Sequence, residues 1–251
     1  MSSFRKRMRN SSSTSSIILA NDLDDKNLEL LEKKTLKNIE TLGKYLCAIK
    51  FNFQLLLPLG EKSIQKINRV AHDFGLQTIA DIKLNDIGNT NLITLQRLWN
   101  SEFDAVIANP IMGPENLSEI VKNAHNDRRG VITLVHMSHP GAKLGYGLKV
   151  QDPNTKYMSN LHSLFLKWSY SLHVDGIVVG ATVPKLIELS RRKAKGRFEI
   201  YSPGVGTQGG NPKEALNAGS NYLIVGRTIL NSKNPQLEAR KLQDLTQIIN
   251  P

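Results

Sequence analysis

The chain has 251 residues, of which 33 are Lys or Arg and 22 are Asp or Glu, so its formal net charge is +11. Its longest apolar runs, such as residues 176–179 and 222–225, fall far short of the roughly 18 residues that a membrane-spanning helix needs, which excludes an integral membrane protein. The single cysteine, Cys47, excludes an intramolecular disulfide and a cysteine-based zinc domain. It also favours a reducing compartment, so a cytoplasmic location is predicted.

The N-terminal segment is basic and rich in serine. Residues 1–21 contain four Arg or Lys residues and no acidic residue, and residues 10–16 consist of Ser, Thr and Asn. Such a composition offers no apolar face to bury, so residues 1–16 are predicted to form a disordered tail outside the fold. A transit peptide and a nucleic-acid-binding arm are alternatives, but a solvated extension is the preferred interpretation.

Eight short segments rich in Val, Ile and Ala are typical of strands buried on both faces. They are residues 17–20, 46–51, 78–82, 105–108, 131–136, 176–179, 199–202 and 222–225. Helical periodicity separates several of them, with one apolar stripe in each of residues 26–43, 62–73 and 236–249. Eight such repeats in about 250 residues predict an α/β fold, a (β/α)8 TIM barrel that forms a single domain over residues 17–251. An open doubly wound sheet is disfavoured because no glycine-rich turn follows the first strand.

In such a barrel, chemistry takes place at the C-terminal ends of the strands. The densest group of charges there is Asp81, Lys83 and Asp86, at the end of the third strand. Side chains alternate along a strand, so Asp81 and Lys83 are predicted to point together into the barrel mouth, with Asp86 on the loop beyond. A lysine between carboxylates stays protonated and can donate a proton. Charges directly after an apolar strand favour this interpretation over a surface ion-pair cluster.

Asp22 and Lys50, at the ends of the first two strands, are weak signals individually. On neighbouring strands of a barrel they would lie beside Asp81 and Lys83 and complete an alternating array of lysines and aspartates. Such a cluster is costly to assemble unless function requires it.

The glycine-rich run from Pro203 to Gly210 follows the seventh strand, and Gly226-Arg227 follows the eighth. These two loops commonly bind phosphate in this fold, because glycine lets backbone N–H groups approach the oxygens. The guanidinium of Arg227 can add a clamp. A phosphate site is therefore favoured over a plain turn.

Two histidines, His136 and His139, flank Ser138 after the fifth strand. Histidines three residues apart on a strand point to opposite faces, so no metal site is predicted. Ser138 is a candidate for contacting a polar edge of a ligand, since no general base is evident that would make it a nucleophile.

Four motifs, in order and spacing, resemble the orotidine 5′-phosphate decarboxylase family over about residues 17–249. Residues 81–87 are similar to its D-x-K-x-x-D-I signature, and the other motifs are residues 137–142, 203–210 and 224–227. The first motif is shared with sugar-phosphate lyases of the same superfamily, whereas the four together are specific.

The resemblance implies the decarboxylation of orotidine 5′-monophosphate (OMP) to uridine 5′-monophosphate (UMP) in pyrimidine biosynthesis, with no metal and no organic cofactor. Lys83 would protonate C6 of the pyrimidine as carbon dioxide leaves, and the catalytic array would comprise Lys50, Asp81, Lys83 and Asp86. The implied substrate-binding residues are Asp22 and Lys50 for the ribose, Ser138 for the pyrimidine, and Gln208, Gly226 and Arg227 for the phosphate. Pro203 is a further implied substrate-binding residue, as is Thr90, which would lie beside Asp86. The loop 203–211 would close as a lid.

The resemblance further implies a homodimer in which Asp86 and Thr90 reach the site of the neighbouring subunit. Two residues depart from the family pattern. Gly88 stands where proline is common and is expected to loosen the turn carrying Asp86, and Asn109 ends the fourth strand where histidine is frequent.

Two other functions compete with this one. A Mg²⁺-dependent sugar-phosphate lyase, of the hexulose-phosphate synthase or keto-gulonate-phosphate decarboxylase type, would share the first motif and add an acidic ligand. A non-catalytic binder of phosphate ligands or nucleic acid would use the basic N-terminus. A nucleic-acid partner is not expected.

Overall fold

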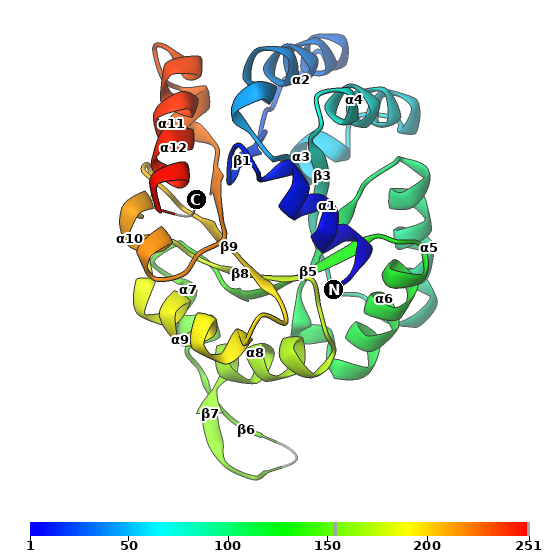
Figure 1. Ribbon diagram of the computed structural model, residues 1–251. Helices are drawn as coiled ribbons and strands as arrows, with labels where there is room; N and C mark the ends of the chain where they lie inside the picture. The colour runs from blue at the N-terminus through cyan, green and yellow to red at the C-terminus, as the bar shows by residue number, and fades with distance from the viewer. Residues whose placement is uncertain (153–154, 250–251) are drawn as a thin grey trace.

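The computed structural model describes residues 1–152 and 155–249, and within them eight parallel strands close into a barrel (Figure 1). Around the barrel the strand order is β1-β10-β9-β8-β5-β4-β3-β2. The strands are β1 (Ile17–Ala20), β2 (Ala48–Asn52), β3 (Gln77–Leu84), β4 (Ala105–Ala108), β5 (Gly130–His136), β8 (Gly176–Val179), β9 (Glu199–Pro203) and β10 (Tyr222–Val225). The predicted single-domain TIM barrel is confirmed, and each predicted strand lies within a few residues of its observed bounds.

The larger helices form a ring outside the barrel, as the fold requires (Figure 1). They are α2 (Leu28–Leu42), α4 (Glu61–Asp73), α5 (Gly88–Asn100), α6 (Pro114–Asn126), α8 (Leu161–Ser171), α9 (Pro184–Ala194), α10 (Pro212–Asn217) and α12 (Pro235–Ile249). Short helical turns occur at η1 (Gly43–Tyr45), α3 (Phe53–Leu56), η2 (Pro110–Met112), α7 (Ala142–Tyr146) and α11 (Arg227–Leu230). Among the described residues, no helix is long and apolar enough to cross a membrane.

A small antiparallel hairpin, β6 (Lys149–Gln151) with β7 (Met158–Asn160), projects from the barrel between α7 and α8 (Figure 1). The sequence analysis did not predict it. Its strands are three residues long and largely exposed, so they carry no buried apolar run that a sequence pattern would reveal.

The hydrophobic core has two layers, because successive side chains of each strand face opposite sides. Outward-facing residues such as Ile17 and Leu19 pack under the helices, and inward-facing residues such as Ile18 and Ile79 fill the barrel. Phe4 and Met8 belong to the inner layer, although both come from the N-terminal segment.

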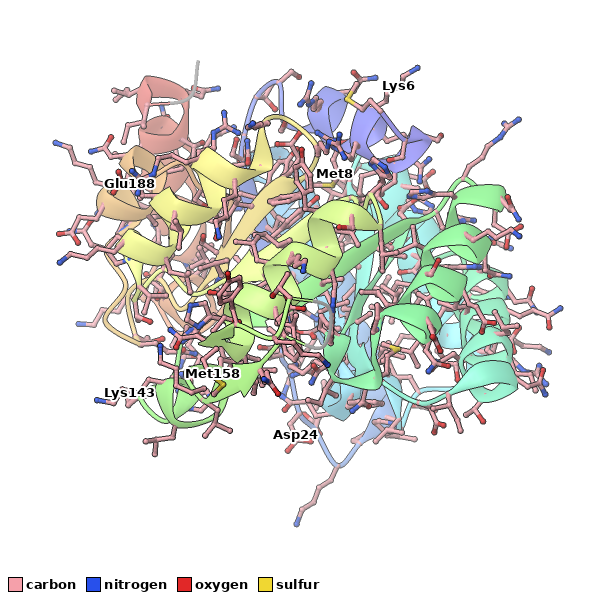
Figure 2. All side chains as sticks on the ribbon, turned by 90° about the horizontal axis from the view of Figure 1, so that it is seen from below. Lys6, Met8, Asp24, Lys143, Met158 and Glu188 are labelled. Carbon is pink, nitrogen blue, oxygen red and sulfur yellow. The ribbon has the colours of Figure 1, made fainter. Side chains whose placement is uncertain are left out.

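That segment corrects the expectation of a disordered tail at residues 1–16. Residues Ser3–Ser11 form helix α1, which lies across the N-terminal end of the barrel (Figure 1). Met8 faces the barrel while Lys6 points to solvent, and Asp24 and Lys143 lie at the opposite end of the molecule (Figure 2). Phe4 and Met8 are one helical turn apart, so two apolar residues suffice to give an otherwise polar helix a buried face.

Basic residues of α1 meet buried carboxylates at this end of the barrel. Arg7 pairs with Asp104 at 3.0 Å, and Arg5 and Arg9 pair with Glu199 at 3.0 and 2.6 Å. Asp104 lies directly before β4 and Glu199 begins β9, so both carboxylates are at the end of the barrel that α1 covers. Both are buried there. The arginines that suggested a solvated arm therefore neutralise charges of the barrel.

Candidate active site

A cavity of about 280 Å³ opens at the C-terminal ends of the strands, away from α1. All eight barrel strands, or the loops that follow them, contribute to it. The apolar part of its wall comprises Ala20, Ile107, Leu134, Val178 and Ile224. The predicted site residues found in the lining are Asp22, Lys50, Asp81, Lys83, Ser138, Pro203, Gln208, Gly226 and Arg227.

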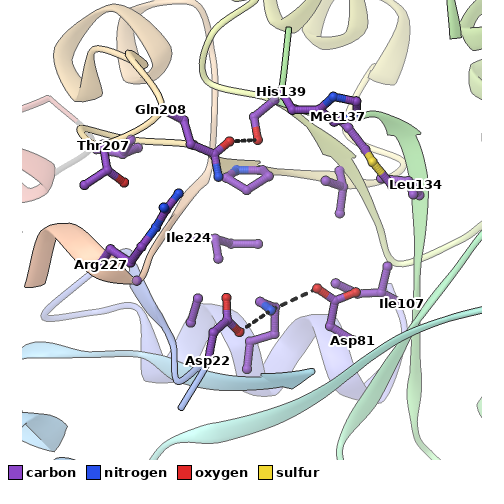
Figure 3. A pocket seen from close by; sticks show the side chains of 18 of the residues that line it. Asp22, Asp81, Ile107, Leu134, Met137, His139, Thr207, Gln208, Ile224 and Arg227 are labelled. Carbon is purple, nitrogen blue, oxygen red and sulfur yellow. Dashed lines mark hydrogen bonds and ion pairs between the residues drawn. The ribbon is translucent and has the colours of Figure 1, made fainter. Parts of the chain in front are cut away.

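Four charged side chains form a continuous line on one side of the cavity. Figure 3 shows the part of this line that runs from Asp22 to Asp81. Nζ of Lys50 is 3.2 Å from Oδ1 of Asp22 and 2.9 Å from Oδ2 of Asp81. The other oxygen of Asp81, Oδ1, accepts a hydrogen bond of 3.0 Å from Nζ of Lys83. The alternating order Asp22, Lys50, Asp81, Lys83 is the one predicted from adjacent strand ends, because β1, β2 and β3 are neighbours in the barrel.

Opposite charges keep the middle of this line ionised. Burial disfavours a charged lysine, but attraction by Asp81 and Asp22 outweighs it and raises the pKa of Lys50 above its usual value. Burial likewise disfavours a charged Asp81, yet Lys50 and Lys83 hold the pKa of that carboxyl below its usual value. The site therefore contains fixed charges before any ligand binds.

The backbone at Lys83 departs from the regular strand expected from the sequence. Pairing between β3 and β4 is irregular between Ala80 and Leu84, and Lys83 has a φ of 47°. Simple alternation therefore does not place the Lys83 side chain; the irregular strand end turns it toward Asp81. A non-glycine residue held in such a conformation costs roughly 1–3 kcal/mol, and such strain is concentrated at functional sites.

The loop after β9 faces the charged line across the cavity and contacts the loop after β5 (Figure 3). Oγ of Ser138 donates a hydrogen bond of 2.6 Å to Oε1 of Gln208, joining the two loops. Gly204 has a φ of 93°, and a Cβ on it would lie 2.4 Å from Cβ of Ser138. Only glycine permits this approach, so the close contact of the two loops depends on the residue type at position 204.

Arg227 begins α11 and points into the cavity on the same side as Gln208 and Thr207 (Figure 3). The hydroxyl of Thr228, the next residue, donates to the carbonyl of Val205 at 2.9 Å and accepts from the N–H of Thr207 at 3.3 Å. These bonds join the two glycine-bearing loops. Within residues 1–152 and 155–249, Arg227 takes part in no ion pair, so its guanidinium is available to an anion.

Two predicted site residues lie outside the cavity of their own chain. Asp86 and Thr90 are exposed and do not contribute to the lining. Oδ1 of Asp86 accepts the N–H of Ile87 at 2.7 Å, within the same loop. Asp86 lies on the loop between β3 and α5, and Thr90 lies in the first turn of α5.

Met137, His139 and Thr207 also line the cavity. They lie within the motifs of residues 137–142 and 203–210, but the sequence analysis assigned none of them a role. His136 is buried outside the lining, with Nδ1 2.7 Å from the carbonyl oxygen of Met137. Among the described residues, no group of three or more His, Cys, Asp or Glu side chains is arranged to hold a metal ion.

Comparisons with known proteins point to one family. Residues 15–242 match the model of the "Orotidine 5′-phosphate decarboxylase / HUMPS family". The chain is 32% identical over 228 residues to the orotidine 5′-phosphate decarboxylase of Pyrococcus abyssi, covering 91% of this chain and 97% of that protein. The matched segment contains every residue that lines the cavity.

Solved structures agree with this match. The orotidine 5′-monophosphate decarboxylase of Methanocaldococcus jannaschii, complexed with inhibitor BMP, superimposes with a TM-score of 0.77 at 29% identity, covering 95% of this chain and 100% of that one. The OMP decarboxylase of Leishmania donovani, at 22% identity and a TM-score of 0.83, covers 99% of each chain and shares the fold.

Proposed function

This chain belongs to the orotidine 5′-phosphate decarboxylase / HUMPS family, and we propose that it converts OMP to UMP and carbon dioxide in pyrimidine biosynthesis. The observation that carries the proposal is the line from Asp22 to Lys83, which shares one cavity with the guanidinium of Arg227. OMP has a carboxylated ring at one end and a phosphate at the other, so its phosphate matches the guanidinium of Arg227 while its reacting ring carbon meets the ammonium group of Lys83 in the charged line. We place the reaction in the cytoplasm, since Cys47 has no disulfide partner in this chain.

The contacts in the cavity suggest how the nucleotide lies. Its phosphate fits between Arg227 and the loop that carries Gln208, where backbone N–H groups of glycines are within the same wall. The ring then extends toward Lys83, with Ser138 at its amide edge. The remaining proposed contacts are Asp22 and Lys50 with the ribose hydroxyls, and Pro203 and Gly226 beside the phosphate.

The chemistry follows from the fixed charges. The bond between C6 and the carboxylate breaks, its electron pair stays on C6, and carbon dioxide leaves. Nζ of Lys83 donates a proton to C6 to form the new C–H bond, and solvent reprotonates the lysine. Because the ammonium groups are held in place beforehand, they stabilise the charge that develops at C6. Asp81 repels the substrate carboxylate, and that repulsion is relieved as carbon dioxide departs.

We propose that this reaction uses neither metal nor organic cofactor. Both oxygens of Asp81 face lysines, and Asp22 is bonded to Lys50, so the carboxylates that Mg²⁺ would need are already engaged by cations. A Mg²⁺-dependent sugar-phosphate lyase is the second candidate, because the matched family model also covers HUMPS. A nucleic-acid arm receives no support, because Arg5, Arg7 and Arg9 contact carboxylates of the barrel.

We also propose that the active unit is a homodimer in which Asp86 and Thr90 complete the site of the neighbouring subunit. Both residues are exposed in the chain, which suits a role across an interface. Apolar side chains on the same and adjacent loops, Ile87 and Ile111, are 66% and 55% exposed. Exposed apolar side chains beside a functional loop support a second copy of the chain as their partner.

The test follows ultraviolet absorbance when OMP is mixed with the protein in EDTA. We expect a rapid decline with the wild type and none with Lys83→Ala, while Lys83→Ala still binds UMP. Lys185→Ala, an exposed lysine on α9, is the matched control and keeps wild-type turnover. Near-normal turnover of Lys83→Ala would contradict the mechanism. No decline with folded, dimeric wild-type protein would favour the Mg²⁺-dependent sugar-phosphate lyase.

A further inference from the structure

The loop of residues 85–90, which carries Asp86 and Thr90, is held by two asparagine side chains from different helices. Nδ2 of Asn91, on α5, donates a hydrogen bond of 2.5 Å to the backbone carbonyl of Asp86. Oδ1 of Asn116, on α6, accepts the backbone N–H of Gly88 at 3.0 Å. One bond therefore needs a side-chain donor and the other a side-chain acceptor.

Both asparagines are also tied to η2, the turn that follows β4. Nδ2 of Asn116 donates to the carbonyl of Met112 at 3.2 Å, and Nδ2 of Asn91 lies 3.7 Å from Sδ of Met112. Asn109 caps η2 by accepting the N–H of Ile111 at 3.2 Å. The loops after β3 and β4 thus form one hydrogen-bonded unit.

Gly88 adopts a φ of 43°, and a Cβ there would meet no atom within 4 Å. Space is therefore not the reason for glycine; the left-handed conformation is, and glycine, unlike proline, also has an N–H that can bond to Asn116. The N–H of Gly88 is bonded to Asn116, so this turn has a side-chain bond of its own, and the expectation that Gly88 loosens it stays a prediction. Residues Gly88 and Asn109, the two departures from the family pattern, belong to this same unit.

Asn91 is nearly fully buried, at 2% exposure, so water does not compete for its bond to Asp86. Its Oδ1 is buried and has no hydrogen-bond partner among the described residues. A buried amide with one unsatisfied atom costs free energy, and an apolar residue would avoid that cost. An asparagine at this buried position is explained if its role is to donate the Nδ2 hydrogen bond to the loop.

We propose that Asn91 and Asn116 are positioning residues that fix the loop presenting Asp86 and Thr90 to the neighbouring subunit's site. The inference rests on the proposed decarboxylase function and its dimer. Asp86 is exposed, and the one bond that its side chain makes to the described residues, to the N–H of Ile87, lies inside the loop, so its placement depends on how the loop backbone is held. The two asparagine bonds hold that backbone on either side of Ile87.

Two substitutions at each asparagine distinguish the loss of a hydrogen bond to the loop from a general loss of packing. Asn116→Asp keeps the acceptor for Gly88 but sets a carboxylate against the Met112 carbonyl, so its kcat/KM for OMP falls between that of the wild type and that of Asn116→Ala, which loses both bonds. Asn91→Asp loses the donor and sets a carboxylate against the Asp86 carbonyl, so it is at least as impaired as Asn91→Ala. We expect the impaired variants to lose roughly 10- to 100-fold in kcat/KM, mostly in kcat, because small misplacements of groups near the reacting atoms are costly. Asn126→Ala, an exposed asparagine on the same helix α6, is the control.

A mixing experiment tests action across the interface. In a dimer of Asn91→Asp with Lys83→Ala, the intact Lys83 of one chain meets the intact loop of the other. After subunit exchange, activity therefore rises above the sum of the two variants measured separately. Sedimentation and urea unfolding verify that each variant remains dimeric and folded.

Several results would overturn the proposal. It fails if Asn91→Asp and Asn116→Ala decarboxylate OMP as well as the wild type, if Asn116→Asp is as impaired as Asn116→Ala, or if exchanged mixtures show no gain. A wild-type protein without OMP turnover would instead remove the proposed function on which the inference rests.

Discussion

Arg5 and Glu199 form a buried ion pair at the N-terminal end of the barrel, although they are 194 residues apart in the sequence. Nη2 of Arg5 lies 3.0 Å from Oε1 of Glu199, and their side chains are 7% and 4% exposed. The guanidinium also donates to the carbonyls of Arg197 and Gly196 at 2.6 and 2.8 Å. The N-terminal helix is therefore an integral part of the barrel.

Arg5→Ala is expected to destabilise the fold, because it leaves a buried carboxylate and two carbonyls short of a partner. Breaking a buried pair in this way costs about 3–5 kcal/mol, and the value here lies toward the lower end because Arg9 still contacts Glu199. Urea unfolding measures the change. Lys6→Ala, exposed on the same helix, is the control. Equal stabilities of the two variants would contradict a structural role for the pair.

The stability contributed by His125 is expected to depend on pH. The hydrogen bond to Asp175, at 3.0 Å, raises the pKa of His125 above its usual value in spite of partial burial. A raised folded-state pKa stabilises the protein fully below the unfolded value of about 6.5 and loses that effect as pH rises through the folded-state value. His125→Gln should therefore lower the free energy of unfolding more at pH 6 than at pH 9. A difference that is the same at both pH values would argue against the ion pair.

Substitution of Arg227 is expected to affect binding more than chemistry, because its guanidinium lies across the cavity from Asp81, to which Lys83 is hydrogen-bonded (Figure 3). Arg227→Ala should raise the KM for OMP roughly 10- to 100-fold, the effect of losing a charge-assisted hydrogen bond. Arg227→Lys should fall between it and the wild type, since lysine keeps the charge without the planar fork. Steady-state kinetics test this, and an unchanged KM would rule out the phosphate contact.

Ser138 and Gln208 are expected to act as a coupled pair, because their side chains bond to each other at 2.6 Å. Ser138→Ala and Gln208→Ala should each lower kcat/KM, and the double variant should lose less than the sum. The coupling free energy expected for such neighbours is roughly 0.5–3 kcal/mol. A double-mutant cycle on kcat/KM measures it, and additive effects would show that the contact between the loops does not matter for turnover.

Two glycine substitutions on one loop separate backbone strain from a clash at the site. Gly204 and Gly209 both have positive φ, so alanine at either position costs about 1–2 kcal/mol in strain. Only at Gly204 would the added Cβ collide with Ser138, since nothing lies within 4 Å at Gly209. Gly204→Ala should therefore lose far more activity than Gly209→Ala at similar stability. Comparable activity in both would mean that the approach to Ser138 is dispensable.

The barrel could be predicted from the sequence because each of its strands and helices produces a pattern among residues that are neighbours in the chain. Each strand, such as residues 222–225, is a short apolar run, and helix stripes such as that of residues 236–249 follow a period of 3.6. In a barrel, strand ends meet at one rim, so Asp22, Lys50 and Asp81 could be placed together from strand order alone. The sequence by itself thus determined the fold class and most of the candidate site.

Only the tertiary structure decided the role of the first sixteen residues and the placement of Asp86. The burial of Phe4 and Arg5 depends on the open barrel end and on Glu199, which no local pattern connects to them. The irregular end of β3 and the bond from Asn116 to Gly88 likewise arise from contacts between distant segments. Local propensity is set by neighbours in the chain, whereas these features are set by partners that meet only after the barrel has closed.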